Sequence, residues 1–119
     1  MGYFQKNEFL SPDNFIHIYS GTSKDELNKQ IDKVLLSDGY RMIVGNPGNA
    51  VYEKGNKTMR VWFGAFVKYY KFKFLTFSDD SGNIKVQVVK DSSGMSGGMI
   101  GMDQVKKELT RLSIVLQSI

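Results

Sequence analysis

The stretch from Thr58 to Phe77 constrains the fold of this chain more than any other part of the sequence. Its 20 residues include eight of the 15 aromatic side chains and four basic ones, and no acidic residue. The aromatic residues are Trp62, Phe63, Phe66, Tyr69, Tyr70, Phe72, Phe74 and Phe77, and the basic ones are Arg60, Lys68, Lys71 and Lys73. A stretch this apolar must be covered by the rest of the fold or by a partner.

The stretch is too long to be one strand, because 20 extended residues would span roughly 66 Å, several times a typical strand. Its second part, Tyr70 to Phe77, has the alternation of a half-buried strand. The even-numbered residues that share one face are Tyr70, Phe72, Phe74 and Thr76. Those expected on the opposite face are Tyr69, Lys71, Lys73, Leu75 and Phe77.

The first part, Thr58 to Tyr69, has two interpretations. Its residue types favour a strand, with a change of phase near Gly64 and Ala65. A helix would place Met59, Trp62, Phe63, Phe66, Val67 and Tyr70 on one face. Gly64 would cost such a helix ~1 kcal/mol. We expect a strand, a bulge and a second strand, with a short helix as the alternative.

The length and composition bound the class of protein. A chain of 119 residues is typical of one domain, so we expect residues 1–119 to share one core. The absence of cysteine excludes disulfides and thiolate metal sites. No apolar run approaches the ~20 residues of a membrane span, and residues 1–15 lack the apolar run of a signal peptide. The compartment stays open: the sequence as written suits a cytoplasmic protein, and a secreted or periplasmic one would follow if a leader had been removed.

The formal net charge of +4 is unevenly distributed. Residues 1–53 carry five basic and seven acidic side chains, whereas residues 54–90 carry eight basic side chains and two acidic ones. Residues 91–119 carry three of each. The basic region therefore coincides with the central strands, which indicates either an anionic partner or a solvated sheet face.

The chain before the aromatic stretch begins with an arm and a strand. Residues 1–13 show no periodic pattern, so we expect a flexible N-terminal arm. Asn14 to Ser20 has strand composition. Phe15, His17 and Tyr19 share one of its faces, while Ile16 and Ile18 share the other. Apolar residues on both faces indicate a central strand.

A helix and a pair of short strands follow. Ser23 and Glu26 fit a capping box at the start of the helix. The apolar stripe of the helix consists of Leu27, Ile31, Val34 and Leu35, and Gly39 stands where a left-handed terminating residue belongs. The short strands, 40–44 and 50–53, are joined by a loop in which Pro47 and Gly48 suit a type II turn.

The C-terminal part predicts a hairpin turn at 78–82, a strand at 83–90 and a long helix. In the strand, Ile84, Val86 and Val88 share one face, and Lys85, Gln87 and Lys90 mainly the other. A loop of glycine, serine and methionine occupies residues 92–101. The helix is expected from about Met102 or Asp103, with Val105, Leu109, Leu112, Leu116 and Ile119 forming its apolar seam.

The expected fold is thus α+β: a strand, a helix, four or five antiparallel strands and a long C-terminal helix across the sheet. Over residues 14–119, this order of elements resembles the TATA-binding-protein-like and helix-grip arrangement. The resemblance rests on element order alone, so no functional residue is carried over with it. Members of such folds bind nucleic acid, lipids or protein partners, and the fold does not choose among these functions.

The loop at 92–101 imitates two catalytic or binding motifs. Gly94 to Gly98 fits the G-x-S-x-G pattern of hydrolases, but the histidine of those enzymes follows the serine, and here the single histidine, His17, precedes Ser96. The loop also precedes a helix, as phosphate-binding loops do, without the lysine and glycine spacing of those loops. No acidic cluster suits a metal. We therefore expect a protein that is not an enzyme and has no cofactor.

The candidate binding surface is the basic and aromatic face of the central strands with the glycine-rich loop beside it. Its residues are Arg60, Trp62, Lys68, Tyr69, Lys71, Lys73, Phe77, Gly94, Gly97 and Gly98. The leading hypothesis is an interaction module that binds a protein partner or a second copy of the chain. One alternative is a small apolar or lipid ligand between the sheet and the C-terminal helix. A second is nucleic acid, since stacking platforms combine aromatic and basic side chains.

Overall fold

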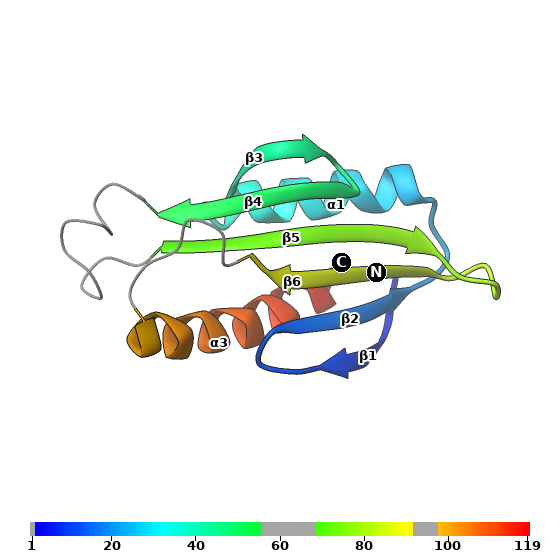
Figure 1. Ribbon diagram of the computed structural model, residues 1–119. Helices are drawn as coiled ribbons and strands as arrows, with labels where there is room; N and C mark the ends of the chain where they lie inside the picture. The colour runs from blue at the N-terminus through cyan, green and yellow to red at the C-terminus, as the bar shows by residue number, and fades with distance from the viewer. Residues whose placement is uncertain (1, 56–68, 92–97) are drawn as a thin grey trace.

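The fold is α+β, and its described part contains a six-stranded antiparallel sheet and two α-helices (Figure 1). The computed structural model describes residues 2–55, 69–91 and 98–119. The strands are β1 (Phe4–Leu10), β2 (Asn14–Tyr19), β3 (Arg41–Asn46), β4 (Asn49–Gly55), β5 (Tyr69–Ser78) and β6 (Ile84–Lys90). The helices are α1 (Lys24–Ser37) and α3 (Gly98–Val115), and a short 3-10 helix, η2 (Leu116–Ser118), follows α3 directly.

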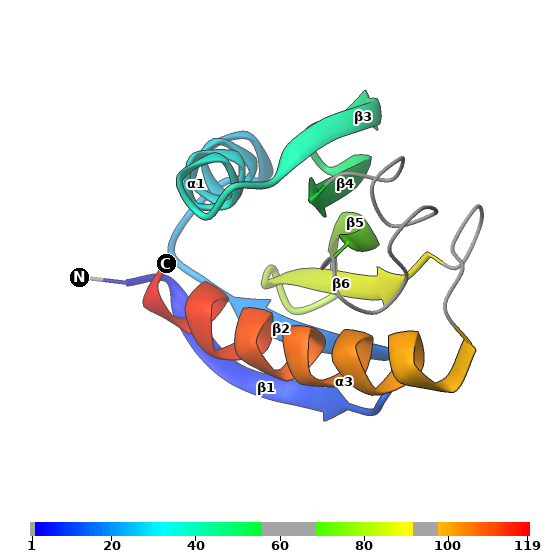
Figure 2. The ribbon, with the colours of Figure 1, turned by 90° about the vertical axis from the view of Figure 1, so that its left-hand side faces the viewer.

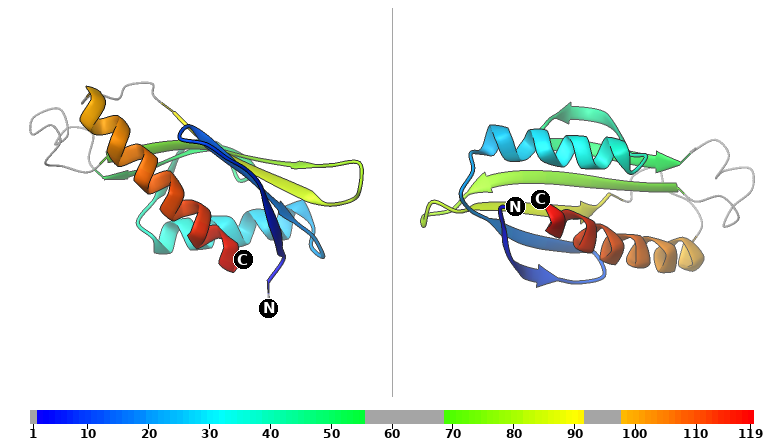
Figure 3. Two further views of the ribbon diagram at one scale, coloured as in Figure 1. Left: turned by 90° about the horizontal axis from the view of Figure 1, so that it is seen from below. Right: turned by 180° about the vertical axis from the view of Figure 1, so that it is seen from behind.

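The strands stand in the order β1-β2-β6-β5-β4-β3, and every neighbouring pair is antiparallel. The two central strands are therefore β6 and β5. Helix α1 connects β2 to β3, which forms the far edge of the sheet. Both helices lie on the same side of the sheet, as the views in Figures 2 and 3 show. We call the side that faces the helices the inner face and the opposite side the outer face.

The hydrophobic core lies between the inner face and the two helices. From the sheet it takes Phe15, Tyr19, Tyr52, Tyr70, Phe72, Phe74, Ile84, Val86 and Val88. From the helices it takes Leu27, Ile31 and Leu35 of α1 and Val105, Leu109 and Leu112 of α3, followed by Leu116 and Ile119. Complete burial of one such side chain stabilises the fold by about 1.5–3 kcal/mol. The alternation predicted for Tyr70, Phe72 and Phe74 and the apolar seam of the C-terminal helix are confirmed.

The Ser23 cap and the terminating glycine predicted for helix α1 are confirmed. The Ser23 hydroxyl accepts a hydrogen bond from the amide of Glu26 at 3.1 Å, as a helix N-cap does. Gly39, just after the helix, has a φ of +95°. A residue with a Cβ rarely adopts this left-handed backbone, which is why glycine suits the position. Gly48, with a φ of +98°, likewise provides the turn between β3 and β4.

Two segments differ from the sequence-based expectations. Residues 4–10, expected within a flexible arm, form strand β1 instead. Tyr3 and Phe4 donate backbone hydrogen bonds to the carbonyl of Ile119 at 2.7 and 3.1 Å, so the two ends of the chain lie side by side (Figure 1). Helix α3 begins at Gly98, four residues or more before the expected start. Helix propensity is a weak prior that tertiary context overrides, and here two glycines did not delay the helix.

A polar network joins the end of α1 to α3. The Tyr40 hydroxyl donates to Oε2 of the buried Glu108 at 2.5 Å. Arg111 donates from Nε to Glu108 Oε1 at 2.9 Å and from Nη1 to Asp38 Oδ1 at 3.0 Å. The hydrogen bond from Arg111 holds the pKa of the Asp38 carboxyl below its usual value. The buried carboxylate of Glu108 thus accepts hydrogen bonds from Tyr40 and Arg111, as a buried charge requires.

Candidate functional site

The outer face of the sheet is the surface that the described helices leave uncovered (Figure 3). The strand register defines which side chains it carries, because residues on directly opposite positions of neighbouring strands share a face. They include Lys6 and Phe9 of β1, Ile16 and Ile18 of β2, Val44 of β3, Val51 and Glu53 of β4, Lys71, Lys73, Leu75 and Phe77 of β5, and Lys85, Gln87 and Val89 of β6.

Apolar residues on this face lie among polar ones, which also include Asn14, Arg41, Asn46 and Asn49. The members that we call the apolar patch are Phe9, Ile16, Val44, Val51, Leu75, Phe77 and Val89. The most exposed of them are Val44, Phe9 and Phe77, with exposed fractions of 62%, 47% and 40%. Ile16, Val51, Leu75 and Val89 lie between them and are half-buried by their neighbours. An apolar surface that extends over six strands is typical of a site that contacts another molecule.

Lys73 lies within the apolar patch. It is exposed, and its register partners on the neighbouring strands are Val51 and Val89. Within residues 2–55, 69–91 and 98–119, it has no hydrogen-bond or ion-pair partner. Lys85 differs, because its ammonium group lies 3.0 Å from the carboxylate of Glu8. The charge that Lys73 places on the patch is therefore available to a binding partner.

One lysine of β6 lies on the opposite face from the one predicted. Lys90 was expected to share a face with Lys85 and Gln87, but it pairs with Phe72 and so belongs to the inner side of the register. There its ammonium group lies 3.3 Å from Asp13 Oδ1. The alternation of β6 continues to its last residue, and Lys90 can face inward because it stands at the end of the strand, next to solvent.

The structure brings together only part of the predicted site. Lys71, Lys73 and Phe77 share the outer face, as expected. Tyr69 is the first residue of β5. Gly98 is the first residue of α3, a helix on the inner side of the sheet, so it does not extend the outer face. The other predicted residues, Arg60, Trp62, Lys68, Gly94 and Gly97, lie outside the described residues, as does the choice between strand and helix for 58–68.

Sequence reasoning missed the valines of this surface. Val44, Val51 and Val89 lie on three different strands, and only the strand order places them around Lys73. One signal was present in the sequence. The strand containing Ile16 and Ile18 is apolar on both faces, although the second face of a strand in a two-layer fold would normally be polar.

The rest of the described chain shows no cluster of side chains suited to metal binding, and its single histidine is part of the core. No three or more of its His, Asp or Glu side chains lie together in a way that could hold a metal ion. His17 is fully buried, with Nε2 at 2.7 Å from the Ser113 carbonyl oxygen and Nδ1 at 3.1 Å from the Asn7 amide nitrogen. Both ring nitrogens thus have hydrogen-bond partners inside the fold, as expected for a histidine packed within the sheet. None of the described helices is long and apolar enough to cross a membrane.

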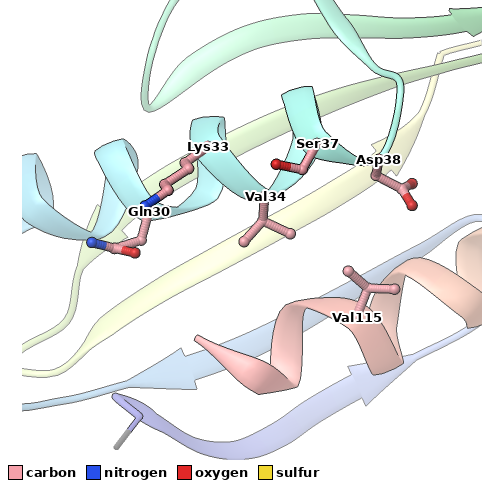
Figure 4. A pocket seen from close by; sticks show the side chains of 6 residues that line it. All are labelled: Gln30, Lys33, Val34, Ser37, Asp38 and Val115. Atoms are coloured by element: carbon pink, nitrogen blue, oxygen red, sulfur yellow. The ribbon is translucent and has the colours of Figure 1, made fainter.

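A groove between the two helices bears on the hypothesis of an apolar ligand. It has a volume of about 380 Å³ and runs between the end of α1 and Val115 of α3 (Figure 4). Its other lining residues are Gln30, Lys33, Val34, Ser37 and Asp38. The leucines between α3 and the sheet, Leu109 and Leu112, are fully buried in the packed core. The groove therefore lies between the two helices, apart from the place between the sheet and the C-terminal helix that was expected for an apolar ligand.

Comparisons with known proteins do not assign the chain to a family. The chain matches no protein-family model and no curated protein. The functional argument therefore depends on the surface itself.

Proposed function

We propose that this protein is a non-catalytic interaction module that binds a protein partner through the outer face of its sheet. The observation that carries the proposal is the apolar patch, in which Phe9, Val44 and Phe77 are each at least 40% exposed. Covering apolar surface contributes about 25 cal/mol per Å², so burial of this patch under a partner is a substantial driving force for binding.

The chemistry of the patch favours a protein over nucleic acid. Single-stranded nucleic acids bind where successive bases stack on aromatic side chains. Here the residues at the middle of the face, Val51, Leu75 and Val89, are aliphatic. The described aromatic side chains, Phe9 and Phe77, belong to strands that are separated by β2 and β6. Aliphatic side chains around the unpaired Lys73 suit the apolar surface of another protein.

Affinity capture with matched variants tests this function. Leu75→Ser makes the patch polar, whereas Ile114→Ser makes the same kind of change at a 64% exposed residue of α3, away from the outer face. We expect one set of proteins to be captured by the wild type and by Ile114→Ser and to be lost with Leu75→Ser. Capture that is insensitive to Leu75→Ser, measured with a variant shown to be folded by circular dichroism, would contradict the proposal.

We also propose that the architecture belongs with the TATA-binding-protein-like and helix-grip arrangements. The proposal is supported by an antiparallel sheet whose two helices lie on one side and whose final helix is long. The decisive measurement is an experimental structure that includes residues 56–68 and 92–97. A helix in the first of these segments that covers the outer face would contradict the assignment and the open docking surface together.

A further inference from the structure

We propose that the occupant of the outer face is an amphipathic helix of a partner protein, with acidic side chains beside its apolar stripe and one of them paired with Lys73. The inference rests on the proposed function and specifies its partner. It follows from three properties of the outer face, namely its backbone hydrogen bonding, the position of its charge and the type of its side chains.

The hydrogen bonding of the sheet requires a partner that satisfies its own backbone. The four strands between the two edge strands are β2, β6, β5 and β4. Each is paired on both sides, so its backbone groups are used within the sheet. An extended peptide gains affinity by adding to a free strand edge, and the face offers none. A helix satisfies its own backbone, and its diameter of about 10–12 Å covers two to three strands spaced about 4.8 Å apart.

The charge of Lys73 requires an acidic residue in that helix. Its register partners are Val51 and Val89, so a helix that covers the apolar patch also covers the base of the Lys73 side chain. Removing an ammonium group from water without a partner is costly. The long side chain lets its charged end reach the rim of a covering helix, where a carboxylate can meet it. The acidic residue is therefore expected beside the apolar stripe of the helix.

The same charge disfavours a second copy of this chain as the occupant. Lys73 lies on β5, one of the two central strands, so two outer faces packed about a two-fold axis would bring two Lys73 side chains close together. Glu53, on the same face, could not easily compensate, because it lies 3.0 Å from Arg41 of its own chain. Like charges placed together disfavour such an interface.

A charge-exchange selection tests the inference. The probe is a displayed library of peptides of about 18 residues, five turns of helix, with a fixed leucine stripe and flanking positions varied among Glu, Lys and Gln. It is selected separately on the wild-type protein, on Lys73→Glu and on Lys106→Glu. The last variant is the matched control, because Lys106 is an exposed residue of α3 on the inner side of the sheet.

We expect glutamate to be enriched beside the stripe on the wild type and on Lys106→Glu, and lysine to be enriched on Lys73→Glu. Exchanging peptides between the wild type and Lys73→Glu should weaken binding about tenfold, which corresponds to 1.4 kcal/mol. The same flanking charge on both proteins, or no selected peptide at all, would overturn the inference. If peptides selected with the same flanking charge on both proteins lost binding to Leu75→Ser, the outer face would remain the docking surface, but the pairing of Lys73 with an acidic residue would be wrong.

Three other results would each overturn the inference, two by identifying a different occupant and one by identifying a different site. A dimer in analytical ultracentrifugation that dissociates with Leu75→Ser would identify a second copy. Binding of single-stranded oligonucleotides that is lost in Lys73→Glu and in high salt would identify nucleic acid. Selected peptides that bind Leu75→Ser as well as the wild type would show that the outer face is not the site, and would contradict the proposed function also.

Discussion

At the scale of single residues, His17 shows how a polar side chain serves the core. Its ring is fully buried and touches the rings of Phe4 and Phe15, with centroids 4.9 and 4.7 Å away. With the proton on Nε2, the ring donates to the Ser113 carbonyl and can accept from the Asn7 amide. The neutral ring therefore links β2 to both β1 and α3.

Protonation of His17 is expected to destabilise the fold. Burial lowers the pKa of His17 below its ordinary value of 6.5, and the backbone hydrogen bonds oppose this shift only in part. As the pH falls below about 6.5, the unfolded chain therefore binds a proton before the folded chain does, and the free energy of unfolding decreases. Urea denaturation between about pH 7 and about pH 5.5 measures this decrease.

The control uses the fact that His17 is the only histidine in the chain. A His17→Asn variant should be less stable at neutral pH, because it leaves a gap in the core. Its free energy of unfolding should however be nearly constant over the same pH range. An equal decrease in the variant would assign the effect to other groups.

At the scale of elements, strand β5 contributes to the stability of the fold with its inner face and to the candidate binding surface with its outer face. Its inner residues Phe72 and Phe74 are at most 3% exposed, whereas Phe77 on the outer face is 40% exposed. The alternation of Tyr70 to Phe77 was sufficient to predict these two faces. It also predicted which side would pack against the rest of the fold, because lysines are rarely buried.

Truncating a phenylalanine on the inner face of β5 and one on its outer face should lower the free energy of unfolding by very different amounts. Phe72→Ala is expected to lower the free energy of unfolding by about 3–5 kcal/mol, because it leaves a cavity in the core. Phe77→Ala should lower it by less than about 1 kcal/mol, since this side chain is not enclosed by the described fold. Chemical denaturation of both variants provides the comparison. Similar losses would mean that Phe77 is covered in the free protein.

Strand β1 and helix α1 show why only some elements could be predicted. Helix α1 has its signals within its own sequence, with Ser23 at the start, an apolar stripe and Gly39 at the end. The strand β1 has exposed side chains over residues 5–10 and two irregularities in its pairing with β2, so it lacks a regular alternation. Its position depends on backbone hydrogen bonds to β2 and to the end of the chain, which no local pattern reveals.

At the scale of the whole molecule, the strand order creates the candidate site. Phe9 and Val44 come from opposite edges of the sheet, and residues of the four strands between them connect these two side chains into one surface. The sequence predicted Lys71, Lys73 and Phe77, because they alternate along a single strand. Val51 and Val89, which neighbouring strands place beside Lys73, could not be predicted in this way, because their proximity depends on which strands are neighbours.

The account as a whole claims that the outer face of this sheet contacts another protein. Site-specific photo-crosslinking measures that contact most directly, with a photoreactive amino acid at position 75 on the outer face or at position 114 on the exposed side of α3. We predict a defined adduct with a different protein from position 75, none from position 114, and loss of the adduct when Lys73→Glu is added. No adduct from position 75, or one that is equally strong from position 114, would contradict the account.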